Sequence, residues 1–235
     1  MIGIGGSGMC PIAEILHSEG FEITGSDVFE SDTLERIRSY GIPVHMGHRG
    51  ENIKGAQLVV YTAAVKQDNP ELVAAKEQGI PAIERSVMLG MVARRYQNSI
   101  AVSGTHGKTS TTAMLTQILI NGGKDPTAII GGKLPFIGGN GRVGASENMV
   151  CEACEYVDTF LQLTPAISII LNIDADHLDY FKDIDHIVKS FEKFAKAVPE
   201  DGKLIAYDAN PFVNKIIKDI PGVITYGYNR NCTYY

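Results

Sequence analysis

The sequence lacks the features that mark several large classes of protein. It contains no tryptophan, and its four cysteines in 235 residues are too few for the disulfide framework of a small secreted domain. No apolar run approaches the roughly 20 residues that a membrane-spanning helix requires. The N-terminus lacks the basic region and the apolar core of a signal peptide. These absences favour a cytoplasmic protein that contacts no membrane.

The charge balance and the pattern of apolar residues narrow the class further. A net charge of −6 argues against nucleic-acid binding through a broad basic surface. Short apolar runs alternate with helical stretches, which predicts an α/β fold with crossover helices. The expected strands cover residues 21–24, 58–62, 100–103, 167–172, 204–207 and 223–226. The expected helices cover residues 9–18, 33–40, 71–78, 86–95, 109–120, 184–197 and 211–217.

Two polar or glycine-rich segments interrupt this pattern. The sequence RRYQN at residues 94–98 precedes a fresh strand and predicts a domain boundary, with one domain at residues 1–97 and another at residues 98–235. The glycine-rich segment 138–142 predicts a mobile loop. Only two residues precede the first glycine motif, and no closing helix follows residue 226. These abrupt ends are compatible with a fragment of a longer protein, and the sequence does not decide between a fragment and a natural product of this length.

The first glycine motif, GIGGSG at residues 3–8, fits the pattern G-x-G-x-x-G. Such glycines allow a tight turn and let the backbone approach a pyrophosphate at a helix N-terminus. Asp27 follows the next expected strand, about where an acid reads a ribose hydroxyl. The motif favours a dinucleotide or a nucleotide sugar and does not separate the two. The competing interpretation is a glycine turn that binds nothing.

The second motif, SGTHGKTS at residues 103–110, resembles a phosphate-binding loop with a shortened glycine spacing. An expected strand precedes it and an expected helix follows it. Lys108 would supply a point charge to β- and γ-phosphates, and the hydroxyl of Thr109 would ligate Mg²⁺. Backbone amides of Gly104 to Lys108 would converge on phosphate oxygens, aided by the helix dipole. This motif predicts an ATP site.

Two further stretches carry candidate ligands. Glu152 lies in an expected strand, where it either approaches the metal of the phosphate loop or is solvated. His177 stands among three aspartates after an apolar strand, which suits a divalent-metal or phosphate site as well as a structural histidine. The pair Cys151-x-x-Cys154 has no second cysteine pair and opens no helix. Free thiols are therefore favoured over zinc or redox chemistry.

Taken together, three stretches resemble the Mur ligases: GIGGSGM at 3–9, SGTHGKTSTT at 103–112 and LNIDADHLDYF at 171–181. The short spacing of the ATP loop is shared with the related folylpolyglutamate synthases. Within the family, the chain is similar to the branch that joins L-alanine to UDP-N-acetylmuramate with ATP, in cytoplasmic peptidoglycan synthesis. The resemblance implies a Rossmann-like UDP-sugar-binding domain, then an incomplete P-loop central domain, and no counterpart of the C-terminal domain that closes over ATP.

The resemblance also implies roles for particular residues. UDP-sugar binding is implied for Gly5, Gly6, Ser7, Gly8, Met9, Ser26 and Asp27. The ATP loop maps onto Gly104, Thr105, His106, Gly107, Lys108, Thr109 and Ser110. Mg²⁺ is implied at Thr109, Glu152 and His177, and the catalytic set is Lys108, Glu152 and His177. Many family members carry E-A-D-E-S-D where this chain has EACEYV at 152–157, so any role of the side chain at position 154 differs here.

The implied reaction activates a substrate carboxylate as an acyl phosphate, which the alanine amine then attacks, without a protein nucleophile. Without a closing domain to exclude water, we expect this chain to bind its ligands and to turn over inefficiently. One alternative is the murein tripeptide ligase of the same superfamily. Another is a non-catalytic module that binds a nucleotide sugar or NAD. The sequence does not predict an oligomeric state.

Overall fold

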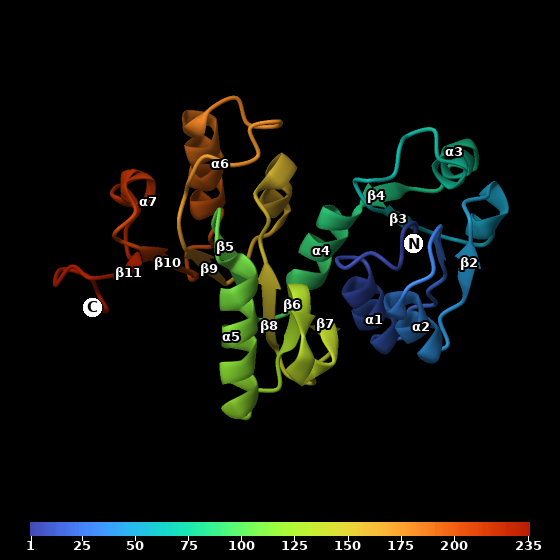
Figure 1. Ribbon diagram of the computed structural model, residues 1–235, viewed down its shortest axis with the longest axis horizontal. Coiled ribbons are helices and arrows are strands. Elements are labelled where there is room, and N and C mark those ends of the chain that lie inside the picture. Colours follow the sequence, from blue (N-terminus) through green and yellow to red (C-terminus); the bar gives the residue numbers. More distant parts are fainter.

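The computed structural model describes all 235 residues, and its strands form two groups along the chain (Figure 1). The first group is two parallel pairs, β1 (Gly25–Asp27) with β2 (Val44–Met46) and β3 (Val59–Tyr61) with β4 (Ala82–Glu84). The fully buried Ile2 forms parallel bridges to both Ser26 and Tyr61 and so joins the pairs. The N-terminal residues therefore act as the central strand of a small parallel sheet.

Four helices accompany these short strands, because each parallel crossover needs a connection that passes over the sheet. They are α1 (Cys10–Ser18), α2 (Asp32–Ser39), α3 (Pro70–Glu77) and α4 (Arg85–Ala93), and the 3₁₀ turn η1 (Gly50–Ile53) lies between β2 and β3. Side chains cap three of the helix starts, because oxygens of Ser31, Asn69 and Glu84 accept backbone amides there.

The second group is a seven-stranded sheet in the order β11-β10-β9-β5-β8-β6-β7. All neighbours are parallel except β6 and β7. The strands are β5 (Asn98–Ser103), β6 (Thr127–Leu134), β7 (Gly139–Arg142), β8 (Asn148–Glu152), β9 (Ile167–Ile170), β10 (Lys203–Tyr207) and β11 (Ile224–Tyr226). The chain leaves β5 for β6 and β8 on one side and later adds β9 on the other, so β5 marks a topological switch point.

Helices cover both faces of this sheet. Helix α5 (Lys108–Asn121) packs through Leu115 and Leu119 on the face that carries Ile100, Val102 and Val150. The opposite face packs against α6 (Ile184–Lys196), α7 (Pro211–Ile217) and the 3₁₀ turn η3 (Tyr156–Gln162). A further 3₁₀ turn, η2 (Pro135–Ile137), joins β6 to β7. The side chains of the strands alternate between these two cores, as a pleated sheet requires.

The glycine-rich segment 138–142, predicted to be a mobile loop, is instead strand β7, and that prediction was wrong. Its glycines permit close approach. A Cβ built on Gly141 would lie 2.5 Å from Cβ of Pro11 in α1, and one built on Gly139 would collide with the guanidinium of Arg36 in α2. Glycine here lets the strand lie against the first group of elements.

Other differences concern short elements. The strand expected at residues 21–24 begins later, at Gly25. Strands β2 and β4 have three residues each, and no apolar alternation marked them. No helix of the structure has the length and apolar character needed to span a bilayer.

Candidate functional site

Three loops meet at the carboxyl end of neighbouring strands in the large sheet. Strand β5 lies between β8 and β9, with Val102 in register with both Glu152 and Ile169. The segments that follow these strands, 104–107, 153–158 and 171–177, therefore emerge at one edge. Ligands of open α/β sheets bind in this position, at the switch point of the topology. The predicted ATP loop, Glu152 and His177 all lie at this edge.

The ATP loop has the backbone that its glycines predicted. Gly104 has φ of 141° and Gly107 has φ of 85°, values that favour glycine. A Cβ on Gly104 would also lie 3.0 Å from Cβ of Leu171. The next residue, Asn172, clamps the loop, because its Oδ1 accepts from the amide of His106 at 2.8 Å and its Nδ2 donates to the carbonyl of His106 at 2.9 Å. Asn172 was not among the predicted site residues.

The clamp changes which amides of the loop are open to a ligand. The amides of Thr105 and His106 donate to the carbonyl and the side chain of Asn172. The amides of residues 107–110, at the start of α5, have no hydrogen-bond acceptor in the structure. Because these donors point from a helix N-terminus, they form a local anion-binding concavity. The amides that remain open to a phosphate are therefore those at the start of α5, and not those of Thr105 and His106.

Lys108 lies inside the loop, with its ammonium fully coordinated. Its Nζ donates to the carbonyls of Gly104 at 2.6 Å and Thr105 at 3.1 Å. The same Nζ lies 3.1 Å from Oε1 and 2.8 Å from Oε2 of Glu155. The side chains of Lys108 and Glu155 are 15% and 2% exposed, so this is a largely buried ion pair. Glu155 was also missed as a site residue, since only its fold neighbours reveal it.

The predicted metal ligands are brought together only in part. The hydroxyl of Thr109 donates to Oε2 of Glu152 at 3.2 Å, and Oε1 of Glu152 accepts from the amide of Gly131 in β6. A hydroxyl and a carboxylate beside open amides are the hard oxygen ligands that Mg²⁺ prefers. Nε2 of His177 faces Glu155 instead, at 3.9 Å from Oε1. No group of three or more His, Cys, Asp or Glu side chains is spaced to hold a metal ion.

The first glycine loop is held by the acid that was expected to read a ribose. Oδ2 of Asp27 accepts from the amide of Gly5 at 2.9 Å, and its Oδ1 accepts from the amide of Val28 at 2.8 Å. Ser26 is buried, and its hydroxyl donates to Oε2 of Glu71 at 2.9 Å. The hydroxyl of Ser26 is therefore bonded to a side chain outside the glycine loop. The carboxylate of Asp27 is bonded to the glycine loop itself, at Gly5.

Two residues that the sequence analysis missed lie against this loop. A Cβ built on Gly8 would lie 2.9 Å from Nη1 of Arg85, the first residue of α4. No acidic side chain forms an ion pair with Arg85, so its charge is available to an anion. Asn140 of β7 donates to the carbonyl of Ser7, which places a strand of the second group beside the first glycine loop. An unpartnered arginine directly after a short strand gave no sequence signal.

The four cysteines are free, as the sequence analysis favoured. Burial raises the pKa of Cys10 and of Cys151 to about 12 in each case. Burial also raises the pKa of Cys154, while the charges of Lys108 and Arg85 lower it. The thiol at position 154 therefore lies within electrostatic reach of both candidate phosphate-binding cations and is held in its neutral form.

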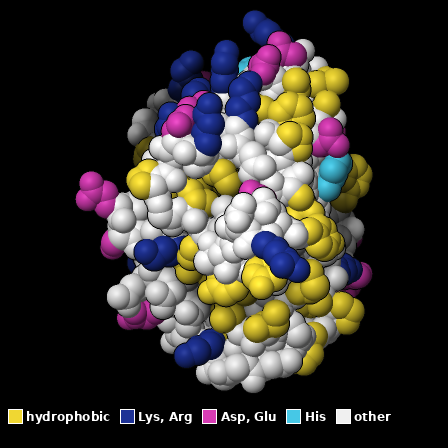
Figure 2. All heavy atoms as spheres, turned by 90° about the vertical axis from the view of Figure 1, so that its left-hand side faces the viewer, with side chains coloured by type: hydrophobic (Ala, Val, Ile, Leu, Met, Phe, Trp, Pro, Cys, Tyr) yellow, Lys and Arg dark blue, Asp and Glu magenta, His cyan; other side chains and the backbone are white.

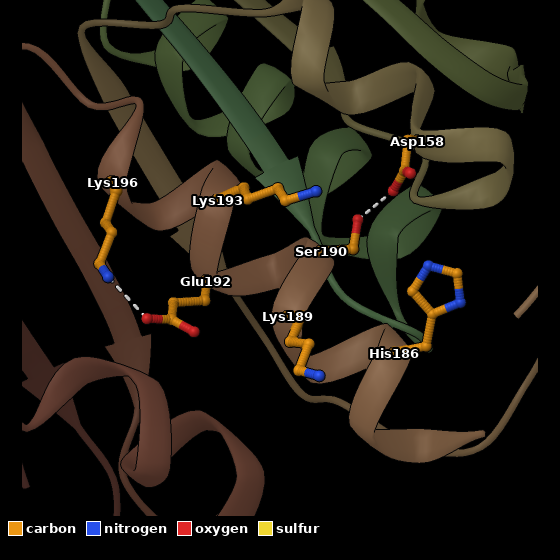
Figure 3. Close-up of a pocket in the computed structure, with 7 residues that line it drawn as sticks. All are labelled: Asp158, His186, Lys189, Ser190, Glu192, Lys193 and Lys196. Atoms are coloured by element: carbon orange, nitrogen blue, oxygen red, sulfur yellow. Dashed lines mark hydrogen bonds and ion pairs between the residues drawn. The ribbon is translucent and has the colours of Figure 1, made fainter. Parts of the chain in front are cut away.

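A hollow lies along α6, and of its lining residues only Asp158 comes from the loops at the site edge (Figure 3). Its lining has no hydrophobic residue: Asp158, His186, Lys189, Ser190, Glu192, Lys193 and Lys196. Both acids have partners, since Glu192 pairs with Lys196 at 2.6 Å and Asp158 accepts from Ser190. In the end-on view, basic side chains gather near the top, at the level of α6, above a larger hydrophobic area (Figure 2). These solvated lysines mark a charged face without a built ligand site.

With this geometry in place, two family descriptions match the chain. Residues 1–97 match the description "Mur ligase family, catalytic domain", and residues 102–235 match "Mur ligase middle domain". The chain belongs to the Mur ligase family. This agrees with the family resemblance of its three sequence stretches and with an α/β fold that carries a phosphate loop.

Named relatives show which Mur ligases the chain resembles in sequence. The chain is 51% identical over 229 residues to the UDP-N-acetylmuramate–L-alanine ligase of Acetivibrio thermocellus, covering 97% of this chain and 49% of that protein. The corresponding ligase of Alkaliphilus metalliredigens is 50% identical over 228 residues, covering 97% of this chain and 50% of that protein. The chain thus spans about half the length of the curated relatives it matches.

Two solved Mur ligase structures are similar over almost the whole chain. The UDP-N-acetylmuramate–alanine ligase of Thermotoga maritima superposes with a TM-score of 0.84 at 30% identity, covering 97% of this chain and 52% of that chain. The UDP-N-acetylmuramate:L-alanyl-γ-D-glutamyl-meso-diaminopimelate ligase of Neisseria meningitidis superposes with a TM-score of 0.85 at 26% identity, covering 95% of this chain and 75% of that chain. Because the second structure is a murein peptide ligase, that activity is tested below as an alternative.

Proposed function

We propose that the chain is the UDP-sugar- and ATP-binding half of a ligase that joins L-alanine to UDP-N-acetylmuramate in cytoplasmic peptidoglycan synthesis. The observation that carries the proposal is the open helix start at residues 107–110 beside Lys108, at the switch point of the sheet. That is a site for a nucleotide's phosphates. The alanine ligases at about 50% identity favour this branch of the family.

The residues of the site fit the chemistry of carboxylate activation. The substrate carboxylate takes the terminal phosphoryl group of ATP, the alanine amine adds to the acyl phosphate, and phosphate leaves. Lys108 and the amides of residues 107–110 bind the phosphate oxygens and stabilise the charge on the transferring group. Lys108 must leave at least one of its three present acceptors to do so, and the carbonyls of Gly104 and Thr105 are the ones within its loop.

We propose that Mg²⁺ is the cation of this site. Mg²⁺ would neutralise charge on the phosphates, and Thr109 and Glu152 are the residues placed to hold it, at 3.2 Å from one another. His177 is proposed as a further ligand from its position in the loop after β9. Glu152 is oriented for this role by the amide of Gly131.

The nucleotide-sugar end is proposed to lie on the first glycine loop. The cation of Arg85 beside Gly8 is placed for a pyrophosphate, and Asp27 holds the loop in shape. Because Asn140 of β7 touches Ser7, the two groups of elements meet at this loop. The sugar's carboxylate would extend from here toward Lys108.

The test is phosphate release by the full-length protein with UDP-N-acetylmuramate, Mg·ATP and L-alanine. We expect release that requires all three substrates. Replacing L-alanine by the tripeptide L-alanyl-γ-D-glutamyl-meso-diaminopimelate tests the second candidate, which the similarity to the murein peptide ligase supports. Release with the tripeptide and not with alanine would favour that ligase. Binding of UDP-sugar or NAD without any phosphate release would favour a non-catalytic module.

A further inference from the structure

The loops that follow β8 and β9 hold an uncommon backbone at the site. Val157, Asp158 and His177 have φ of 52°, 56° and 51°, in the left-handed region that non-glycine residues avoid. Such a residue is strained and persists only where its surroundings hold it. The two loops therefore need specific contacts that fix them, and His177 is one of the residues so fixed.

A reciprocal pair of tyrosine–aspartate hydrogen bonds joins the two loops. The hydroxyl of Tyr156 in the first loop donates to Oδ2 of Asp179 in the second at 2.9 Å. The hydroxyl of Tyr180 in the second loop donates to Oδ2 of Asp158 in the first, also at 2.9 Å. Oδ1 of Asp158 in turn accepts from Ser190 on α6 (Figure 3). Each loop thus supplies one tyrosine and one aspartate.

The two tyrosines differ in what their rings contact. The ring of Tyr156 packs against the imidazole of His177, with centroids 4.8 Å apart and planes inclined by 45°. The ring of Tyr180 packs on Phe181 and His186, and it lies edge-on to the ring of Tyr156, with centroids 6.2 Å apart. The two hydrogen bonds have the same length, although that of Tyr180 is the more buried. Only Tyr156 packs its ring on His177.

We propose that Tyr156 is a positioning residue, which holds the imidazole of His177 against the site through its ring and fixes the loop of His177 through its hydroxyl. The role rests on the proposed function, because it assigns His177 to the metal and phosphate site. Many family members have serine at this position of the E-A-D-E-S-D motif, and serine has no ring to pack on an imidazole. Side chains that orient a metal-ligating histidine affect metal affinity or activity by about 10- to 100-fold when replaced.

The experiment compares Tyr156→Phe, Tyr156→Ser and Tyr180→Phe in the full-length protein. Tyr156→Phe and Tyr180→Phe each lose one hydrogen bond to an aspartate of the other loop, while Tyr156→Ser removes the ring as well. The first readout is the ring-proton NMR signal of His177, assigned by its loss in His177→Gln, during titration with Mn²⁺·ATP. The second is the Mg²⁺ concentration for half-maximal ligation, measured apart from kcat.

For Tyr156→Ser we expect a shifted His177 resonance and about tenfold more Mn²⁺·ATP or Mg²⁺ for the same response. Tyr156→Phe should keep the resonance position and change the metal requirement by roughly threefold, less than the 10- to 100-fold range for such partners, because the ring that contacts His177 is kept. Tyr180→Phe should change it by less than about twofold, with a loss of thermal stability similar to that of Tyr156→Phe.

Three outcomes would overturn the positioning role. They are an unchanged metal requirement in folded Tyr156→Ser, equal effects of Tyr180→Phe and Tyr156→Ser, or no broadening of His177 by Mn²⁺·ATP in the unmodified protein. The proposed function fails separately. If Mn²⁺·ATP broadens His177 but alanine gives no phosphate release, ligation is wrong and the positioning of His177 stands.

Discussion

The ammonium of Lys108 lies 2.8 Å from Oε2 of Glu155, whose side chain is only 2% exposed. The lysine follows β5 and the glutamate lies in the loop after β8, so the pair joins two of the segments that form the site. Removing one partner of a buried pair leaves a charge without compensation, whereas removing both is far less costly. The pair therefore links the proposed phosphate site to the stability of the fold.

Stability should show this coupling directly. We expect Lys108→Ala to lower the free energy of unfolding by roughly 3 kcal/mol, because Glu155 is left buried and unpaired. The double variant Lys108→Ala/Glu155→Gln should recover most of that loss. Urea denaturation of the two variants and of the single Glu155→Gln measures the interaction energy. Additive effects would show that the pair contributes nothing as a pair.

Nucleotide binding should depend on the same lysine. We expect Lys108→Ala to weaken Mg·ATP binding and to reduce ligation by at least about 100-fold, because no other lysine lies in the loop to stabilise the transferring phosphoryl group. Measuring the double variant with Glu155→Gln separates this effect from instability. Calorimetry with Mg·ATP and phosphate release are the readouts, and unchanged turnover would contradict the phosphate-loop interpretation.

Asn172 should support the ATP loop without touching the nucleotide. Asn172→Ala removes both hydrogen bonds to His106, and each such bond contributes about 1 kcal/mol. We expect roughly tenfold weaker Mg·ATP binding, which is the equivalent of 1.4 kcal/mol. Asn148→Ala is the matched control, since its amide bonds Lys124 and Ser146 at the other end of β8. Equal effects of the two variants would contradict a local role.

Arg85 should bind the nucleotide sugar and not ATP. We expect Arg85→Ala to weaken binding of UDP-N-acetylmuramate by about tenfold or more, as for a lost hydrogen bond from a charged donor. Arg94→Ala, at the other end of α4, serves as control. Calorimetry with each ligand measures the difference. Unchanged sugar binding in folded Arg85→Ala would remove the arginine from the site.

Gly8→Val should act in the same direction as Arg85→Ala, because a Cβ at position 8 displaces the guanidinium, to which it would lie at 2.9 Å. Gly5→Val is a poorer probe, since its Cβ would lie 2.8 Å from Cδ2 of Leu34 and 2.9 Å from Oδ2 of Asp27. We expect Gly8→Val to spare ATP binding and Gly5→Val to lower thermal stability as well. Calorimetry and thermal unfolding separate the two effects. Tight NAD binding by the unmodified chain would favour a dinucleotide site.

The buried thiols predict a loss of stability in alkaline solution. Burial raises the pKa of Cys151 from 9.0 to about 12, and Cys10 shows the same change. The unfolded chain therefore loses these protons near pH 9 while the folded chain keeps them, so stability falls as pH rises from about 9 towards 12. We expect Cys151→Ser to reduce that slope in denaturant unfolding measured from pH 8 to pH 10. An unchanged slope would show that other groups dominate.

The amino-acid sequence by itself determined the helices whose residues follow one continuous helical pattern. Helix α7 occupies the predicted residues, and α1, α5 and α6 begin and end within one residue of the prediction. The conformation of the loop at residues 104–107 was predictable because a strand, a glycine turn and a helix follow one another directly in residues 98–121, so it depends on neighbours in sequence.

Only the tertiary structure decided which side chains complete the site. Glu155, Asn172 and Arg85 come from three separate loops or helices, and no local pattern links them to Lys108 or Gly8. Segment 138–142 was wrongly predicted to be a loop for the same reason. Its glycines fit against Pro11 and Arg36, which lie more than 100 residues earlier in the sequence. The physical reason is that hydrogen bonds and close contacts between distant segments depend on how the sheet brings strand ends together, and sequence periodicity reports only which face of an element is buried.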